Sequence, residues 1–136
     1  MPDGHSERPR LHEMFAVEMR PGLSESIRDL ECLRSAIHAT AVEGLFVMPA
    51  GANLEAAPES EQAFVRLLAT LESTFELIVF DAPPANRYVT ALSWLAHMDA
   101  VLMVLAEDSD TQNTKLGKRI MAGLGVKIDG VVLNKR

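Results

Sequence analysis

Apolar residues along the chain form two alternating patterns, continuous runs and helical stripes. Four runs predict short buried strands, at residues 45–48, 77–80, 101–105 and 128–133. Between and before them, apolar residues recur every three or four positions, which predicts amphipathic helices at residues 25–40, 59–74, 89–97 and 116–124. Strands that alternate with helices of this length favour right-handed crossovers, so the pattern predicts an α/β fold whose parallel sheet carries helices on both faces.

Serine, proline and glycine positions mark the boundaries of these elements. Ser24 is predicted to cap the helix at 25–40, and Gly125 is predicted to cap the last helix at its C-terminus. Residues 1–22 contain three prolines and two glycines and no sustained apolar period, so we expect an irregular arm with one short helical turn near residues 11–15. The remainder, residues 23–136, is predicted to be one domain.

The run at 77–80 ends on a carboxylate, Asp81, which is followed by Pro83 and Pro84. Neither proline can extend a strand or a helix, so the chain must turn after Asp81. In open α/β sheets, ligands bind beyond the carboxyl ends of the strands. Asp81 is therefore a candidate ligand for a metal ion or a substrate. The alternative is that its carboxylate only starts a turn.

Composition narrows the classes of function. The chain has 136 residues, 48% hydrophobic and 24% charged, which is typical of a globular domain. A net charge of -6 argues against binding to nucleic acid or to an anionic membrane surface, and no apolar run reaches the roughly 20 residues of a membrane span. The single cysteine, Cys32, excludes an internal disulfide and favours the cytoplasm.

Other polar residues give weaker signals. The four histidines are scattered, without the spacing of metal ligands, and no G-x-S-x-G sequence supports a hydrolase. The acidic residues at 107, 108 and 110 are predicted to form a solvated loop before the last helix, with a divalent cation site as the alternative.

Five segments resemble, in order and spacing, those of the bacterial tyrosine kinases that regulate capsule and exopolysaccharide synthesis. These kinases are P-loop ATPases related to chromosome-partitioning and septum-site ATPases. The segment ending in Asp81-Ala82-Pro83-Pro84 resembles their Walker B strand; the others are residues 8–15, 21–24, 47–51 and 130–134. The resemblance covers nearly the whole chain, and it implies a Rossmann-like, three-layer P-loop domain.

The resemblance also assigns roles to particular residues. Asp81 resembles the Walker B carboxylate that holds a water bound to Mg²⁺, and Pro83 and Pro84 shape the turn after it. Asn134 stands where the family contacts the adenine edge, which an amide can match as both donor and acceptor. Asp3 stands at the first carboxylate of the family's Asp-x-Asp-x-Arg motif, whose second Asp and Arg are His5 and Glu7 here.

The 136 residues contain no phosphate-binding loop of the form G-x-x-x-x-G-K-[ST]; the pair Gly117-Lys118 fails the spacing. Compared with the family, the strand, loop, helix and second strand before residue 1 are missing. We therefore expect a degenerate kinase-like domain that is non-catalytic alone and acts by binding in polysaccharide synthesis or export. The alternatives are a fragment of an active kinase whose phosphate loop lies elsewhere, with Mg-ATP as cofactor once the site is completed, and an unrelated doubly wound binding module.

The missing first strand has a structural consequence. The sheet must either pair the 77–80 and 101–105 strands directly or take a strand from another chain, because a long apolar edge promotes association. The sequence thus predicts a protein partner or self-association, and the resemblance suggests a membrane polysaccharide-export protein as that partner. Direct insertion into a membrane and binding to nucleic acid are not expected.

Overall fold

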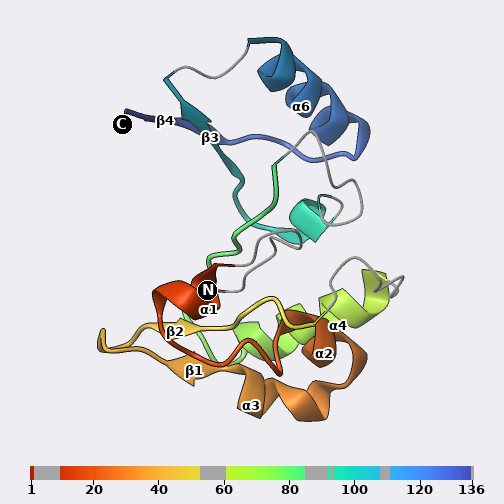
Figure 1. The fold of residues 1–136 in the computed structure, drawn as a ribbon. Coiled ribbons are helices and arrows are strands. Elements are labelled where there is room, and N and C mark those ends of the chain that lie inside the picture. Colours follow the sequence, from red (N-terminus) through yellow and green to blue (C-terminus); the bar gives the residue numbers. More distant parts are fainter. Residues whose placement is uncertain (2–9, 53–60, 85–91, 93, 108–110, 136) are drawn as a thin grey trace. The chain divides into compact units, whose positions relative to one another are not determined.

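The computed structural model describes residues 1, 10–52, 61–84, 92, 94–107 and 111–135 (Figure 1). The chain divides into a first unit, Met1–Ala82, and a second unit, Pro83–Arg136, and each is described by itself. The predicted division into an arm at 1–22 and one domain at 23–136 stays a prediction.

The first unit combines short helices with a two-stranded hairpin. Its elements are α1 (Leu11–Met14), α2 (Leu23–Arg28), the 3₁₀ helix η1 (Leu30–Cys32), α3 (Leu33–Ala36), β1 (His38–Ala39), β2 (Phe46–Val47) and α4 (Glu61–Glu72). Strands β1 and β2 pair antiparallel, with His38 opposite Val47. Between them, Gly44 has a φ of 77°, a conformation that suits glycine. The one helical turn predicted in the N-terminal arm is confirmed as α1.

The predicted helix at 25–40 is wrong in its second half, and Ser24 is not its N-cap. The helix begins at Leu23 with Gly22 as N-cap, and it ends at Arg28. Asp29 adopts an extended conformation (φ -141°, ψ 108°), and its carboxylate accepts a hydrogen bond from the Glu31 N–H at 2.9 Å. This local bond competes with the helical one, which is why aspartate interrupts helices. A 3₁₀ turn and α3 follow, and the chain then enters β1, which the apolar spacing did not reveal.

Helix α4 confirms the predicted helix at 59–74 and supplies much of the core of the first unit. Its buried positions are Ala63, Phe64, Leu67 and Leu71, one stripe at helical spacing. The segment after it is extended but belongs to no strand ladder, so the strand predicted at 77–80 is not observed. Aromatic contacts hold this segment instead. The ring of Phe75 lies 5.5 Å from that of Phe46, and the ring of Phe80 lies 5.9 Å from that of Phe64.

The second unit contains the 3₁₀ helix η2 (Trp94–His97), β3 (Leu102–Ala106), α6 (Thr111–Gly123) and β4 (Gly130–Asn134). Strands β3 and β4 pair in parallel, with Leu102 opposite Gly130 and Ala106 opposite Asn134. Trp94 is buried, as its place beside Leu95 indicates, whereas Leu116 of the predicted α6 stripe is exposed. Residues 89–91 and 93 of the helix predicted at 89–97 lie outside the described residues, and its last four residues form η2.

Helix α6 ends as its sequence predicts. The Gly125 N–H donates to the Ala122 carbonyl at 3.1 Å, and the Val126 N–H donates to the Met121 carbonyl at 2.9 Å. These two bonds form a Schellman motif, in which a left-handed residue satisfies the last helical carbonyls. Gly125 supplies that residue with a φ of 74°. The chain is thereby directed into β4.

The mixed helix and strand content confirms an α/β architecture in part. Within the described residues, each sheet has two strands, and only the β3–β4 ladder is parallel. A three-layer arrangement with helices on both faces of a larger parallel sheet stays a prediction. No helix in the described ranges has the length and apolar character needed to cross a membrane.

Candidate functional site

Asp81, the central predicted site residue, lies at the end of the extended segment after α4. Its side chain is exposed and its backbone forms a single β-bridge. Pro83, which the resemblance places in the turn, is buried, whereas Pro84 is exposed. The role of Asp81 as a ligand of a metal-bound water stays a prediction.

Asn134 is the last residue of β4 and is exposed. Its carbonyl accepts a hydrogen bond from the Glu107 N–H at 3.3 Å, which ties the end of β4 to the end of β3. Asn134 thus lies at the carboxyl end of a parallel strand, where α/β sheets bind ligands. Asp81 belongs to the first unit and Asn134 to the second, and each is placed only within its own unit.

The N-terminal acidic motif, Asp3 with His5 and Glu7, lies outside the described residues, as do two members of the acidic loop, Asp108 and Asp110. Among the described residues, no group of three or more potential metal-binding side chains occurs. The metal role of Asp81 therefore has no support from neighbouring protein ligands in this part of the chain.

Two of the motif segments, 21–24 and 47–51, meet in the first unit. The Leu23 N–H donates to the Pro49 carbonyl at 2.8 Å, and the Ser24 N–H donates to the Ala50 carbonyl at 3.0 Å. Ser24 and Ser26 are buried here, and the Ser26 hydroxyl donates to the Gly22 carbonyl at 2.9 Å. The start of α2 is therefore fixed against the corner that follows β2.

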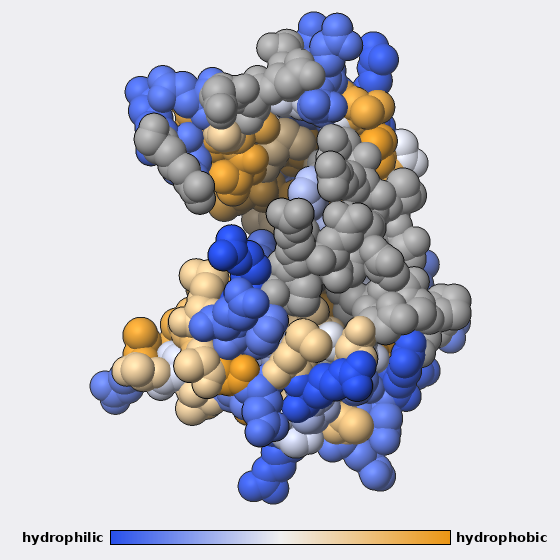
Figure 2. Space-filling model, in the orientation of Figure 1, coloured by the Kyte–Doolittle hydropathy of each residue, from blue (hydrophilic) through white to orange (hydrophobic). Residues whose placement is uncertain are grey.

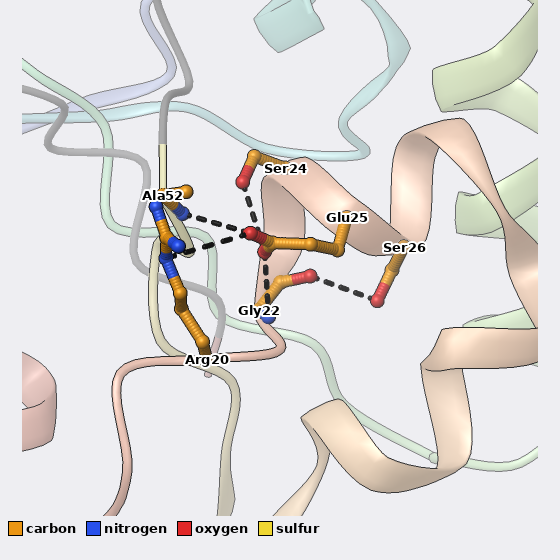
Figure 3. Close-up of polar contacts among 6 residues, drawn as sticks. All are labelled: Arg20, Gly22, Ser24, Glu25, Ser26 and Ala52. Atoms are coloured by element: carbon orange, nitrogen blue, oxygen red, sulfur yellow. Dashed lines mark hydrogen bonds and ion pairs between the residues drawn. The ribbon is translucent and has the colours of Figure 1, made fainter.

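Glu25 joins these two segments through its carboxylate (Figure 3). Oε2 accepts hydrogen bonds from the Gly22 N–H at 2.9 Å and the Ser24 hydroxyl at 3.0 Å, and Oε1 accepts one from the Ala52 N–H at 3.0 Å. The Arg20 guanidinium lies 4.0 Å from Oε1. Partial burial disfavours the charged form, but the hydrogen bonds from Gly22, Ala52 and Ser24 outweigh it and lower the pKa of Glu25.

Two glycines allow the segments 21–24 and 47–51 to approach each other closely. A Cβ at Gly22 would collide with the backbone of Gly51 and with the Pro49 carbonyl. A Cβ at Gly51, which has a φ of 86°, would collide with the Glu25 carboxylate and the Ser24 hydroxyl. Both oxygens of Glu25 are occupied, so we interpret this Glu25 clamp (Gly22, Ser24, Glu25, Gly51 and Ala52) as structural. Apolar periodicity could not reveal it; the paired Pro-Gly and Pro-Ala-Gly segments were the available signal.

The second unit has its own carboxylate anchor. Asp129 Oδ2 accepts a hydrogen bond from the Val101 N–H at 3.0 Å, and Oδ1 lies 3.0 Å from Lys127 Nζ. The Val101 N–H and Lys127 lower the pKa of Asp129. Beside it, a shallow hollow of about 410 Å³ is lined by residues that include Lys118, Val126 and Asp129. Because Asp129 is already engaged, this hollow offers a ligand mainly apolar contact and the Lys118 cation.

No protein-family model matches the chain. Individual proteins do match over almost all of it. The chain is 29% identical to the candidate tyrosine-protein kinase CapB of Staphylococcus aureus, over 98% of this chain and 60% of CapB. It is 28% identical to the tyrosine-protein kinase ptk of Acinetobacter johnsonii, over 97% of this chain and 18% of ptk. It is 29% identical to the tyrosine-protein kinase CpsD of Streptococcus pneumoniae, over 98% of this chain and 60% of CpsD.

Solved structures agree with these relatives. The chimerical protein CapA2B2 superposes with a TM-score of 0.84 and 27% identity, over 97% of this chain and 60% of that one. The tyrosine kinase domain of BceF superposes with a TM-score of 0.77 and 24% identity, over 95% of this chain and 52% of that one, which shows the fold alone. The chain thus spans about 60% of the length of CapB and CpsD. The predicted resemblance is confirmed: along nearly its whole length, this chain is a relative of the bacterial tyrosine-protein kinases.

Proposed function

We propose that these 136 residues form a kinase-like domain that does not catalyse phosphoryl transfer alone and that acts by binding in exopolysaccharide synthesis or export. One observation carries the proposal. The chain aligns over 98% of its length with the kinase CapB, yet its sequence contains no phosphate-binding loop. Backbone N–H groups and a lysine of that loop hold the nucleotide phosphates in P-loop enzymes, so phosphoryl transfer requires them.

The residues assigned to nucleotide contacts are the part of a nucleotide site that these 136 residues would supply. Asp81 is assigned to a Mg²⁺-bound water, Asn134 to the adenine edge, and Pro83 and Pro84 to the turn after Asp81. None of these assigned roles supplies hydrogen-bond donors to the phosphates of a nucleotide. Charge-assisted bonds to phosphates are the strong ones in such sites, so no affinity that is measurable at millimolar nucleotide is expected. Asp3 would add a second carboxylate without the acidic and basic partners of its motif.

The binding partner in this proposal is a protein of the polysaccharide-export machinery at the membrane, with this domain on the cytoplasmic side. The resemblance to capsule and exopolysaccharide kinases supports that assignment, and the single Cys32 favours a reducing compartment. A regulatory domain of this kind needs a docking surface and no completed nucleotide site.

A second function has its own support. The chain spans 60% of CapB, so a phosphate loop supplied by other polypeptide would complete a kinase. In that case Mg-ATP is the cofactor, Asp81 orders the metal through water, and the enzyme is an ATP-dependent protein tyrosine kinase. The two functions differ in whether this chain retains measurable affinity for the nucleotide.

Isothermal titration calorimetry with Mg-ATP and Mg-ADP tests the proposal directly. The binding domain is expected to give no heat at millimolar nucleotide. Heat that Asp81→Ala abolishes, and that the matched control Asp99→Ala preserves, would overturn it in favour of the kinase fragment. Asp99 is also an exposed aspartate, and no nucleotide role is assigned to it. Transfer of labelled phosphate from ATP to protein by the purified chain would overturn the proposal by a second route.

A further inference from the structure

Positive charge is concentrated in the last part of the chain. Residues 111–136 contain six basic residues and one acidic residue, whereas residues 1–110 contain seven basic and eighteen acidic residues. The whole chain carries a net charge of -6, so most of its sequence repels an acidic partner and residues 111–136 attract one. Charge that is distributed in this way steers a partner toward one surface. An acidic partner is therefore expected to bind at residues 111–136.

Three of these basic residues lie on one face of α6. Lys115, Lys118 and Arg119 are three and four positions apart, so their side chains are neighbours on the helix, and all three are exposed. Within the described part of the chain, none of them forms an ion pair. Like charges at this spacing destabilise a helix, and no acidic residue occurs at positions 111–128 to offset them. Because unpaired cations are costly to bury, this face requires either water or an anionic partner.

An apolar hollow lies beside these cations. It has a volume of about 410 Å³, and all of its lining residues belong to the second unit. Lys118 and Ala122 line it from α6, and Val126 and Val131 line it from the chain that follows the helix. Figure 2 shows hydrophilic surface next to apolar surface on the second unit. The hollow is of the size of small ligand pockets and has a positive charge at its rim.

Asp129 also lines the hollow, but its charge is already paired. Its Oδ2 accepts the Val101 N–H at 3.0 Å, and its Oδ1 lies 3.0 Å from Lys127 Nζ. The carboxylate therefore leaves the cations of α6 without a counter-charge. The hollow lies at the start of β4, and Asn134 at the end of that strand is about 10 Å farther along the chain than Val131. A ligand in the hollow is thus separate from the position assigned to the adenine edge.

We infer that the α6 surface, which consists of Lys115, Lys118, Arg119, Ala122 and the hollow beside them, binds an acidic peptide segment of a partner protein. One apolar side chain of the peptide enters the hollow, and carboxylates on either side of it contact the three cations. A nucleic acid fits less well, because its phosphate backbone has no apolar side chain to enter the hollow and the chain as a whole is acidic. The inference rests on the proposed binding role, for which it names the docking surface and the chemistry of the partner.

Titration with a synthetic peptide tests the inference. The probe is a pentapeptide, capped at both ends, with one leucine between two pairs of glutamates, and NMR follows the amide shifts of the 136-residue chain. The Lys118, Ala122 and Val131 amides are expected to shift together. Binding should weaken about tenfold between roughly 50 mM and 500 mM salt, because salt screens the ionic contacts. Replacement of the leucine by serine should also weaken binding about tenfold, because burial of the leucine side chain is lost.

Two pairs of variants separate the α6 surface from general charge and hydrophobicity. Lys118→Glu should weaken binding of the probe about tenfold, since repulsion replaces an exposed ion pair worth up to about fivefold. Its control is Arg66→Glu on α4, which changes the net charge equally at an exposed position and should leave the affinity within about twofold. Ala122→Leu should fill the hollow and abolish the preference for leucine over serine. Its control is Ala69→Leu, at an exposed alanine of α4, and circular dichroism establishes that each variant is folded.

Three binding results would overturn the inference. These are no amide shifts at millimolar peptide, equal weakening by Lys118→Glu and Arg66→Glu, and equal binding of a peptide in which lysines replace the glutamates. A short DNA duplex that binds more tightly than the probe, and that Lys118→Glu weakens, would identify nucleic acid as the occupant and also overturn it. Acetylation of the Lys118 amine that is much slower than that of Lys127 in the free chain would show that the surface is already covered. None of these measurements involves a nucleotide, so calorimetry with Mg-ATP tests the proposed function separately.

Discussion

Replacement of Gly51 by alanine is expected to open the Glu25 clamp. The substitution has two costs: an alanine at a φ of 86°, and a methyl group that collides with the Glu25 carboxylate and the Ser24 hydroxyl. The left-handed conformation alone costs about 1 kcal/mol for a residue with a Cβ. Displacing the carboxylate loses hydrogen bonds from the Gly22 and Ala52 N–H groups, each worth about 1 kcal/mol at this partly exposed site. The sum is about 3 kcal/mol, a drop in Tm on the order of 10 °C.

Gly44→Ala is the matched control, because Gly44 has a similar φ of 77° and nothing within 4 Å of the added methyl group. It is expected to cost only the conformational part, about 1 kcal/mol. Urea unfolding followed by circular dichroism gives both free energies of unfolding, and exchange of the Ser24 amide reports the clamp locally. Equal destabilisation by the two variants would refute the clamp, since the difference of about 2 kcal/mol isolates the carboxylate contacts.

Three further predictions concern stability. Glu25 has a lowered pKa in the folded chain, so its contribution to the free energy of unfolding is present above the unfolded pKa of about 4.3 and is lost as the pH falls through the folded pKa. Glu25→Gln should therefore flatten the pH dependence of the free energy of urea unfolding in this range. An unchanged slope would contradict this. Leu67→Ala should cost about 3 kcal/mol by urea unfolding because Leu67 is 1% exposed, whereas Leu116→Ala should cost well under about 1 kcal/mol; similar costs would argue against the described core. Asp129→Ala should speed hydrogen exchange of the Val101 amide, and an unchanged rate would exclude the anchoring role.

Local signals predicted a large part of the fold. Helix α4, strands β3 and β4 and the Gly125 terminus follow from apolar spacing and from the conformational freedom of glycine, both of which act within a few residues. The break at Asp29 did not follow, because a side-chain hydrogen bond outweighed a continuous apolar stripe. The segment at 77–80 was mistaken for a paired strand, since an apolar run does not specify which neighbour completes the ladder.

The candidate site residues stay predictions. Asp81 stands out because it follows an apolar run, whereas Asn134 was assigned by the kinase resemblance, and the comparisons confirm that resemblance. The Glu25 clamp was missed because its donors come from positions 22, 24 and 52, and only the fold brings them to one carboxylate.

The clamp also has a kinetic consequence. Glu25 and the Ala52 N–H are 27 residues apart along the chain, so their bond forms only after that length of chain has closed into a loop. Loop closure costs conformational entropy before the contact returns any stabilisation, and non-local contacts of this kind slow folding. Helix α4 can form from neighbouring residues alone, whereas the start of α2 is stabilised only after the corner at Pro49–Ala52 has packed against it. The corner is therefore expected to be a late-forming part of the first unit, with Gly51 substitutions speeding unfolding more than they slow folding.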